Sequence, residues 1–229
     1  WEADHVVLAT GGYHVPIVPP WAPALDPAIT QLESAAYRNP EELADGAVLV
    51  VGSGQSGAQI AEDLHLAGRS VHLSVGRAPR SPRRYRGKDV VDWLDRMGYY
   101  AMPISDHSDP RTVRSKTNHY LTGRDGGREI DLRRRAMEGM QLHGRLSSIT
   151  GDHIGFADDL AANLDQADAV YCRIRSSIDS WIEQEGIDVP AEPAYSPCWQ
   201  PSQIEDPGID LSSQLLAANQ PLHTGRRVS

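Results

Sequence analysis

The chain has 229 residues and a mass of 25.1 kDa, and hydrophobic residues make up 40% of it, which is enough to form a core. Its formal net charge of -9 and its pI near 5.4 argue against a general binder of nucleic acid or of anionic membranes, because such proteins carry a basic surplus. Any binding of phosphate must therefore depend on a local group of residues.

The two cysteines, Cys172 and Cys198, are separated without a CxxC motif, which predicts neither a disulfide framework nor a zinc site. No apolar run approaches the roughly 20 residues that a membrane helix needs, and no apolar h-region after a charged start indicates a signal peptide. We therefore expect a soluble, cytoplasmic protein that has no membrane partner.

The first elements in the chain are extended. The sequence opens on Trp1 and soon enters an apolar run, which favours a fragment of a longer protein. Val6–Ala9, followed by Thr10 and Gly11, predicts a buried strand that ends in a turn. Five prolines between residues 16 and 27 then predict an irregular crossing segment, and a short helix is expected around Pro40.

A strand, a helix and a second strand follow within about 30 residues, which is the pattern of a βαβ unit. Ala47–Val51 is a continuous apolar run that is too short for a helix, and it predicts a strand buried on both faces. Ser56–Ala67 has apolar residues at helical spacing and ends at Gly68, and Val71–Val75 is the second strand. The right-handed crossover of such a unit makes its two strands parallel neighbours.

The rest of the chain predicts smaller elements and one long helix. Asp89–Met97 and Ile130–Met140 have helical patterns, and the polar stretch between them, from Ser105 to Glu129, is expected to be an ordered excursion or a lid. Leu142–Ile149 and His153–Phe156 are separated by Gly-Asp and predict a hairpin.

Asp158–Glu185 gives the longest helix signal, because apolar residues recur there every fourth position and Gly186 supplies the cap. We interpret this stripe as core packing, and Cys172 beside it as a small buried hydrophobe. Prolines return after Val189 and predict an irregular tail. The expected organisation is a linker region over residues 1–45, a nucleotide-binding domain over 46–189 with an insertion around 103–130, and the tail over 190–229.

The strongest motif is a GxGxxG loop that follows the first strand of the βαβ unit and opens its helix. Its six residues are Gly52, Ser53, Gly54, Gln55, Ser56 and Gly57. The first glycine permits the tight turn, the second lets the backbone approach a pyrophosphate, and the third lets the helix pack closely. The amides of the first helical turn would then face the phosphates, which predicts a dinucleotide site. A tight turn without a ligand is the weaker alternative.

The end of the second strand indicates which dinucleotide binds. NAD and FAD sites place an acid about 20 residues after the loop, but residues 74–88 contain no acid and six cations. Arg77, just past the strand, can pair with a 2′-phosphate, so NADP(H) is predicted. Arg80 is included in this site, although a solvated basic loop, or packing against an acidic surface, is an equal alternative for it and for the other arginines. A nucleic-acid patch at Arg77–Lys88 is disfavoured by the acidic chain.

Three segments resemble class B flavin-dependent monooxygenases, and more closely a bacterial subgroup related to the flavin-containing monooxygenases. They are VVLATGGYHVPIVPP at residues 6–20, VLVVGSGQSGAQIAEDL at 48–64 and SVGRAPRSPRRYRGKD at 74–89. The resemblance implies an NADPH domain inserted in an FAD domain, with FAD as the second cofactor, and it implies nucleotide contacts at Thr10, Gly11, Gln55, Ser56 and Arg77. It also implies that NADPH reduces the flavin, which then activates oxygen, while the protein positions the reactants.

Other chemistry finds little support. The nine histidines show no spacing with acids that predicts a metal site, and the glycine loop lacks the GxSxG elbow of a hydrolase. No catalytic side chain can be identified. Polar residues at 118–125, among them His119, Arg124 and Asp125, could line a site, but a surface loop is the favoured interpretation.

These observations predict an α/β protein with a three-layer Rossmann-like FAD/NAD(P)-binding fold, a parallel sheet, a small hairpin and flanking helices. The first functional hypothesis is an oxidoreductase that passes hydride from NADPH to FAD and acts on a small-molecule substrate. The second is a non-catalytic or truncated NADP(H)-binding module without a complete flavin site. No nucleic-acid partner is expected, and a homodimer is compatible with the sequence.

Overall fold

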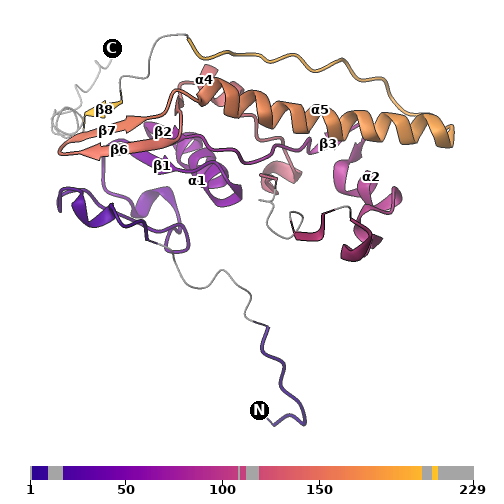
Figure 1. Ribbon diagram of the computed structural model, residues 1–229, viewed down its shortest axis with the longest axis horizontal. Coiled ribbons are helices and arrows are strands. Elements are labelled where there is room, and N and C mark those ends of the chain that lie inside the picture. Colours follow the sequence, from indigo (N-terminus) through magenta and orange to yellow (C-terminus); the bar gives the residue numbers. More distant parts are fainter. Residues whose placement is uncertain (1, 10–17, 108, 112–118, 203–207, 211–229) are drawn as a thin grey trace, which may run out of the picture.

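The structure is a computed structural model that describes residues 2–9, 18–107, 109–111, 119–202 and 208–210. Its centre is a three-stranded parallel sheet in the order β1-β2-β5, made of β1 (Val48–Val51), β2 (Val71–Ser74) and β5 (Gln141–His143). Helix α1 (Gln55–Leu66) connects β1 to β2, as the βαβ pattern predicts (Figure 1). The α/β class with a parallel sheet and flanking helices is confirmed.

Helix α1 packs on one face of this sheet, where apolar side chains of the two strands meet apolar side chains of the helix. Val48 lies opposite Val71 and Val50 opposite Leu73, so these side chains share a face. They form one cluster with Ala58, Ala61 and Leu64 of α1, which are completely buried. Burial of a leucine of this kind stabilises the fold by about 1.5–3 kcal/mol.

Strand β1 lies at the edge of the sheet among the described residues, which corrects one prediction. It pairs with β2 alone there, and Val51 is 49% exposed, so the strand is not buried on both faces. An apolar run identifies a strand, but the neighbours of that strand are fixed by distant residues. The predicted strand Val6–Ala9 is also wrong for the described residues, because the segment joins no sheet and Val6, Val7 and Leu8 are 79–87% exposed.

The predicted hairpin is present but begins later than expected. Residues Gln141–His143 pair in parallel with β2 instead, and the hairpin is made of β6 (Leu146–Thr150) and β7 (His153–Phe156). The tail is irregular over 190–202, but it contributes an unexpected strand, β8 (Ile209–Asp210), which pairs with β7. Phe156 of β7 stacks on His143 of β5, and so the hairpin sheet contacts the parallel sheet on the side away from α1.

The long helix α5 (Leu160–Glu185) runs along the molecule, with α2 (Val90–Arg96) against its carboxyl-terminal half (Figure 1). Trp93 of α2 is completely buried beside Ile178 and Ile182 of α5, which confirms core packing for that part of the stripe. Cys172 is only partly buried. No helix among the described residues is both long enough and apolar enough to cross a bilayer.

The remaining elements are short. They are α4 (Leu132–Met137), the antiparallel pair β3 (Arg84–Tyr85) and β4 (Lys88–Asp89), and the 3₁₀ helices η1 (Ala22–Ala24), η2 (Pro40–Glu42), η3 (Tyr99–Ala101), η4 (Ile104–Asp106) and η5 (Arg124–Gly126). The α4 and η2 helices lie where short helices are predicted.

Candidate functional site

The glycine loop joins the end of β1 to the start of α1, and two of its glycines are required by the fold itself. Gly52 has a φ of 101°, a conformation that other residues rarely adopt. A Cβ added to Gly57 would lie 1.8 Å from the Gly52 carbonyl oxygen, so only glycine lets the helix pack this closely. Both positions match the roles that the sequence assigns to the first and third glycines.

Gly54 has no such requirement. It is the N-cap of α1 with a φ of -66°, and a Cβ there would meet no atom within 4 Å. Among the described residues no side chain caps the helix, so the amides of its first turn and the positive end of its dipole are not satisfied by a side-chain cap. This arrangement suits the close approach of an anionic group to the backbone.

Two of the predicted contact residues have side chains that are hydrogen-bonded to backbone groups within the protein. The buried Ser53 Oγ accepts a hydrogen bond from the Gly76 amide at 2.9 Å. Gln55 Oε1 accepts from the Leu121 amide at 2.8 Å, and Gln55 Nε2 donates to the carbonyl oxygen of the same residue. The polar excursion is thus fixed to the start of α1 at Leu121. Because both side chains are already hydrogen-bonded, Ser53 and Gln55 can offer a ligand mainly their backbone. Ser56 remains exposed.

The two arginines of the predicted site lie in different surroundings. Arg77 is exposed just past β2, at the same end of the sheet as the glycine loop. Arg80 is buried, with 3% of its side chain exposed, and it pairs with Glu129, Asp131 and Asp168. Burial works to lower the pKa of Arg80, but the neighbouring carboxylates outweigh it and raise the pKa further above its usual range. The structure therefore favours the alternative of acidic packing for Arg80.

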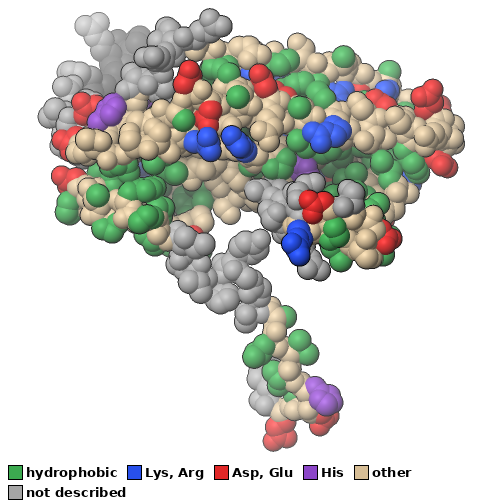
Figure 2. All heavy atoms as spheres, in the orientation of Figure 1, with side chains coloured by type: hydrophobic (Ala, Val, Ile, Leu, Met, Phe, Trp, Pro, Cys, Tyr) green, Lys and Arg blue, Asp and Glu red, His purple; other side chains and the backbone are tan. Residues whose placement is uncertain are grey.

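The other cations after β2 do not form one open basic surface. Arg83 pairs with Asp89 and Arg86 with Asp179, each at 2.8 Å. Figure 2 shows acidic and basic side chains interspersed over the viewed face. The arrangement gives the nucleic-acid alternative no support.

Among the described residues, no group of three or more histidine, cysteine, aspartate or glutamate side chains is placed to hold a metal ion.

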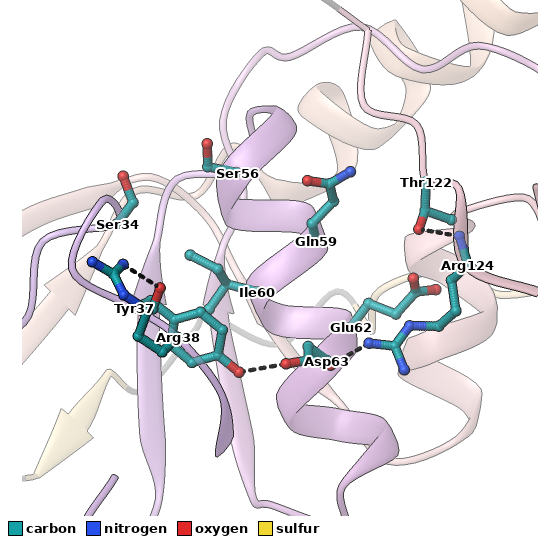
Figure 3. Close-up of a pocket in the computed structure, with 10 residues that line it drawn as sticks. All are labelled: Ser34, Tyr37, Arg38, Ser56, Gln59, Ile60, Glu62, Asp63, Thr122 and Arg124. Atoms are coloured by element: carbon teal, nitrogen blue, oxygen red, sulfur yellow. Dashed lines mark hydrogen bonds and ion pairs between the residues drawn. The ribbon is translucent and has the colours of Figure 1, made fainter. Parts of the chain in front are cut away.

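A polar hollow of about 530 Å³ lies beside α1 (Figure 3). The Tyr37 hydroxyl donates to Asp63 Oδ2 at 2.6 Å, and Arg124 forms an ion pair with the same carboxylate. Burial and the Asp63 carboxylate raise the pKa of Tyr37 above its usual range. The guanidinium of Arg124 is thus paired within the protein.

The other two predicted nucleotide contacts, Thr10 and Gly11, lie outside the described residues.

A second hollow, of about 290 Å³, lies at the carboxyl ends of β1 and β2, and its lining includes two residues that the sequence reasoning missed. They are Trp21, from the segment before the sheet, and Arg145, just after β5. Arg145 could have been found from its position, because the carboxyl ends of neighbouring parallel strands meet at one edge. Trp21 has no local signal that places it there.

Comparison with known proteins gives partial matches. The profile of the L-lysine 6-monooxygenase/L-ornithine 5-monooxygenase family matches residues 1–87. An uncharacterised CzcO-like oxidoreductase of Geobacillus kaustophilus is 36% identical over 161 residues, which are 69% of this chain and 44% of that protein. The uncharacterised oxidoreductase CzcO of Bacillus subtilis is 35% identical over 98 residues, which cover 43% of this chain and 28% of the relative.

The flavin-containing monooxygenase iboF of Amanita muscaria is 36% identical over 101 residues, 41% of this chain and 18% of that protein. The matches thus span less than half the length of each of these relatives. No solved structure matches the chain.

Proposed function

Because the chain belongs to the flavin-dependent monooxygenase family, which it matches over part of its relatives' length, we propose that it binds NADPH for a flavin-dependent oxidoreductase. When bound, NADPH supplies hydride and the flavin accepts it. The residues of this chain hold and orient the nicotinamide cofactor.

The observation that carries the proposal is the open space outside Gly54. The conformation of this residue is available to any amino acid, and a side chain would meet nothing there. Glycine at this position has no evident use in the fold, but it allows a pyrophosphate to approach the uncapped first turn of α1. This open space beside Gly54 is the feature of the loop that supports the proposed site.

Arg77 supports NADPH over NADH. The exposed guanidinium lies past β2, where an NADH site would carry an acid, and residues 74–88 contain none. A guanidinium can form a bidentate, charge-assisted pair with a 2′-phosphate. In the proposed site, the loop amides hold the pyrophosphate and Arg77 selects the phosphorylated ribose.

Gly54→Asp tests the site in a way that separates binding from folding. Aspartate is a favourable N-cap, and its charge suits the helix dipole, so the thermal stability of the variant should equal or exceed that of the native chain. The same charge would repel the pyrophosphate, so calorimetric titration should show NADPH affinity reduced at least about tenfold. Gly54→Asn is the uncharged control and should retain more affinity than Gly54→Asp. Undiminished NADPH binding by the aspartate variant would refute the site.

The flavin half of the proposal has its own measurement. A purified chain with the flavin absorption band at about 450 nm would support the oxidoreductase. A colourless chain that still binds NADPH would support the second hypothesis, an NADP(H)-binding module without a complete flavin site.

A further inference from the structure

The hollow at the carboxyl ends of β1 and β2 is continuous with the proposed loop. Gly52 and Gly76, which follow the two strands, both line it. Ser53 joins their loops through its hydrogen bond to the Gly76 amide. In open parallel sheets, ligands bind outside the carboxyl ends of the strands, so this hollow lies where the cofactor would extend from the glycine loop.

The wall of the hollow near β2 carries no side chain at Gly76. A Cβ added to Gly76 would meet no atom within 4 Å, and Gly76 is not in the left-handed region. Like Gly54, it is a glycine that the fold itself does not require. Ser74, the last residue of β2, also lines the hollow, and none of the described residues that line it is acidic.

We propose that this hollow binds the adenosine 2′-phosphate end of NADPH, with the Trp21 indole stacked on adenine and Arg145 paired with the 2′-phosphate beside Arg77. This inference rests on the proposed function and assigns residues to its specificity. Trp21 then closes the site from a segment that precedes the nucleotide-binding unit.

Asp159 holds Arg145 in place but leaves about half of its side chain exposed. Asp159 accepts hydrogen bonds from the Arg145 amide at 2.9 Å and from its Nε at 2.5 Å, while 52% of the side chain is exposed. The contact to Asp159 fixes one side of the guanidinium. The side chain still lines the hollow, so its terminal nitrogens can serve an anion there.

Trp21 is half-buried and stands on an anchored turn. It precedes η1, whose Ala22 is buried and accepts a hydrogen bond from Gln31 Nε2 at 3.0 Å. Trp21 therefore lines the hollow from a turn whose backbone is held in place. Aromatic side chains in such positions bind the faces of nucleobases by stacking.

Calorimetric titration with 2′,5′-ADP and 5′-AMP separates the two roles. Arg145→Gln should weaken 2′,5′-ADP binding about tenfold and change 5′-AMP binding little, because only the first ligand carries the 2′-phosphate. Trp21→Ala should weaken both ligands by a similar factor, about tenfold, and Trp21→Phe should retain most of the affinity. Arg134→Gln, which removes an exposed arginine from α4, is the charge control and should change neither.

Tryptophan fluorescence reports contact between Trp21 and the ligand, which a purely structural role of Trp21 would not produce. Binding of 2′,5′-ADP should quench part of the tryptophan emission, and Trp21→Phe should abolish that part. The inference is overturned if Arg145→Gln and Trp21→Ala bind both ligands like the native chain while Gly54→Asp still blocks NADPH, an outcome that leaves the proposed function standing. If the native chain binds no NADPH, both proposals fail.

Discussion

The Gly76 amide donates a hydrogen bond to the buried Ser53 Oγ over 2.9 Å, and this contact ties the loop after β2 to the loop after β1. The proposed pyrophosphate cradle and the arginine that would select the 2′-phosphate are therefore parts of one connected structure. A cofactor that meets both loops would find their spacing already set, which reduces the ordering that binding requires.

Ser53→Ala should destabilise the protein and weaken NADPH binding together. The substitution leaves the Gly76 amide without its acceptor, which costs about 1–3 kcal/mol. Urea unfolding measures the first effect and calorimetry the second. Ser56→Ala is the matched control, because Ser56 is exposed and its loss should change the free energy of unfolding by less than about 0.5 kcal/mol. Equal stability of the two variants would show that the contact between the loops is unimportant.

Arg80→Met should be among the most damaging single substitutions in the chain. It leaves Glu129, Asp131 and Asp168 without the guanidinium that they share, and removal of one partner from a buried ionic group costs about 3–5 kcal/mol. Arg77→Ala, which removes an exposed arginine nearby, should cost less than about 0.5 kcal/mol in the same urea unfolding experiment. A cost below about 1 kcal/mol for Arg80→Met would mean that Arg80 does not hold this network together.

Asp159 should contribute to stability at neutral pH and lose that contribution in acid. Burial works to raise the pKa of Asp159, but hydrogen bonds from the Arg145 amide and guanidinium and from Asn163 outweigh it and hold the pKa below its usual value. A carboxyl with a lowered pKa stabilises the fold above its unfolded pKa, about 3.9, and the contribution disappears as the pH falls through the folded value.

The corresponding measurement is the free energy of unfolding of the native chain and of Asp159→Asn between pH 7 and pH 3. The difference between them should be constant down to about pH 4.5 and shrink below about pH 4. A difference that grows in acid would contradict the assignment.

The βαβ unit could be predicted because its signals are local. The apolar run before Gly52, the helical spacing after it and the stop at Gly68 all lie within a short segment, and each matches the structure. The glycine loop was found for the same reason, since each glycine has a distinct geometric role there.

Features that depend on distant residues were missed. The predicted hairpin began at Leu142, but Gln141–His143 pairs with β2, which lies about seventy residues earlier in the chain. Arg80 looked like a ligand contact because its carboxylate partners come from residues 129–168, which no local pattern connects to it. Trp21 lies in a proline-rich segment whose sequence gives no sign of the hollow that it lines.

The central claim, an NADPH site at the glycine loop and Arg77, is tested most directly by titrating NADPH and NADH into the native chain and into Arg77→Ala. The native chain should prefer NADPH. The variant should lose about 10- to 150-fold in NADPH affinity, the equivalent of a charge-assisted pair worth about 1.5–3 kcal/mol, and little in NADH affinity. Equal losses for the two cofactors, or no loss for either, would contradict the assignment.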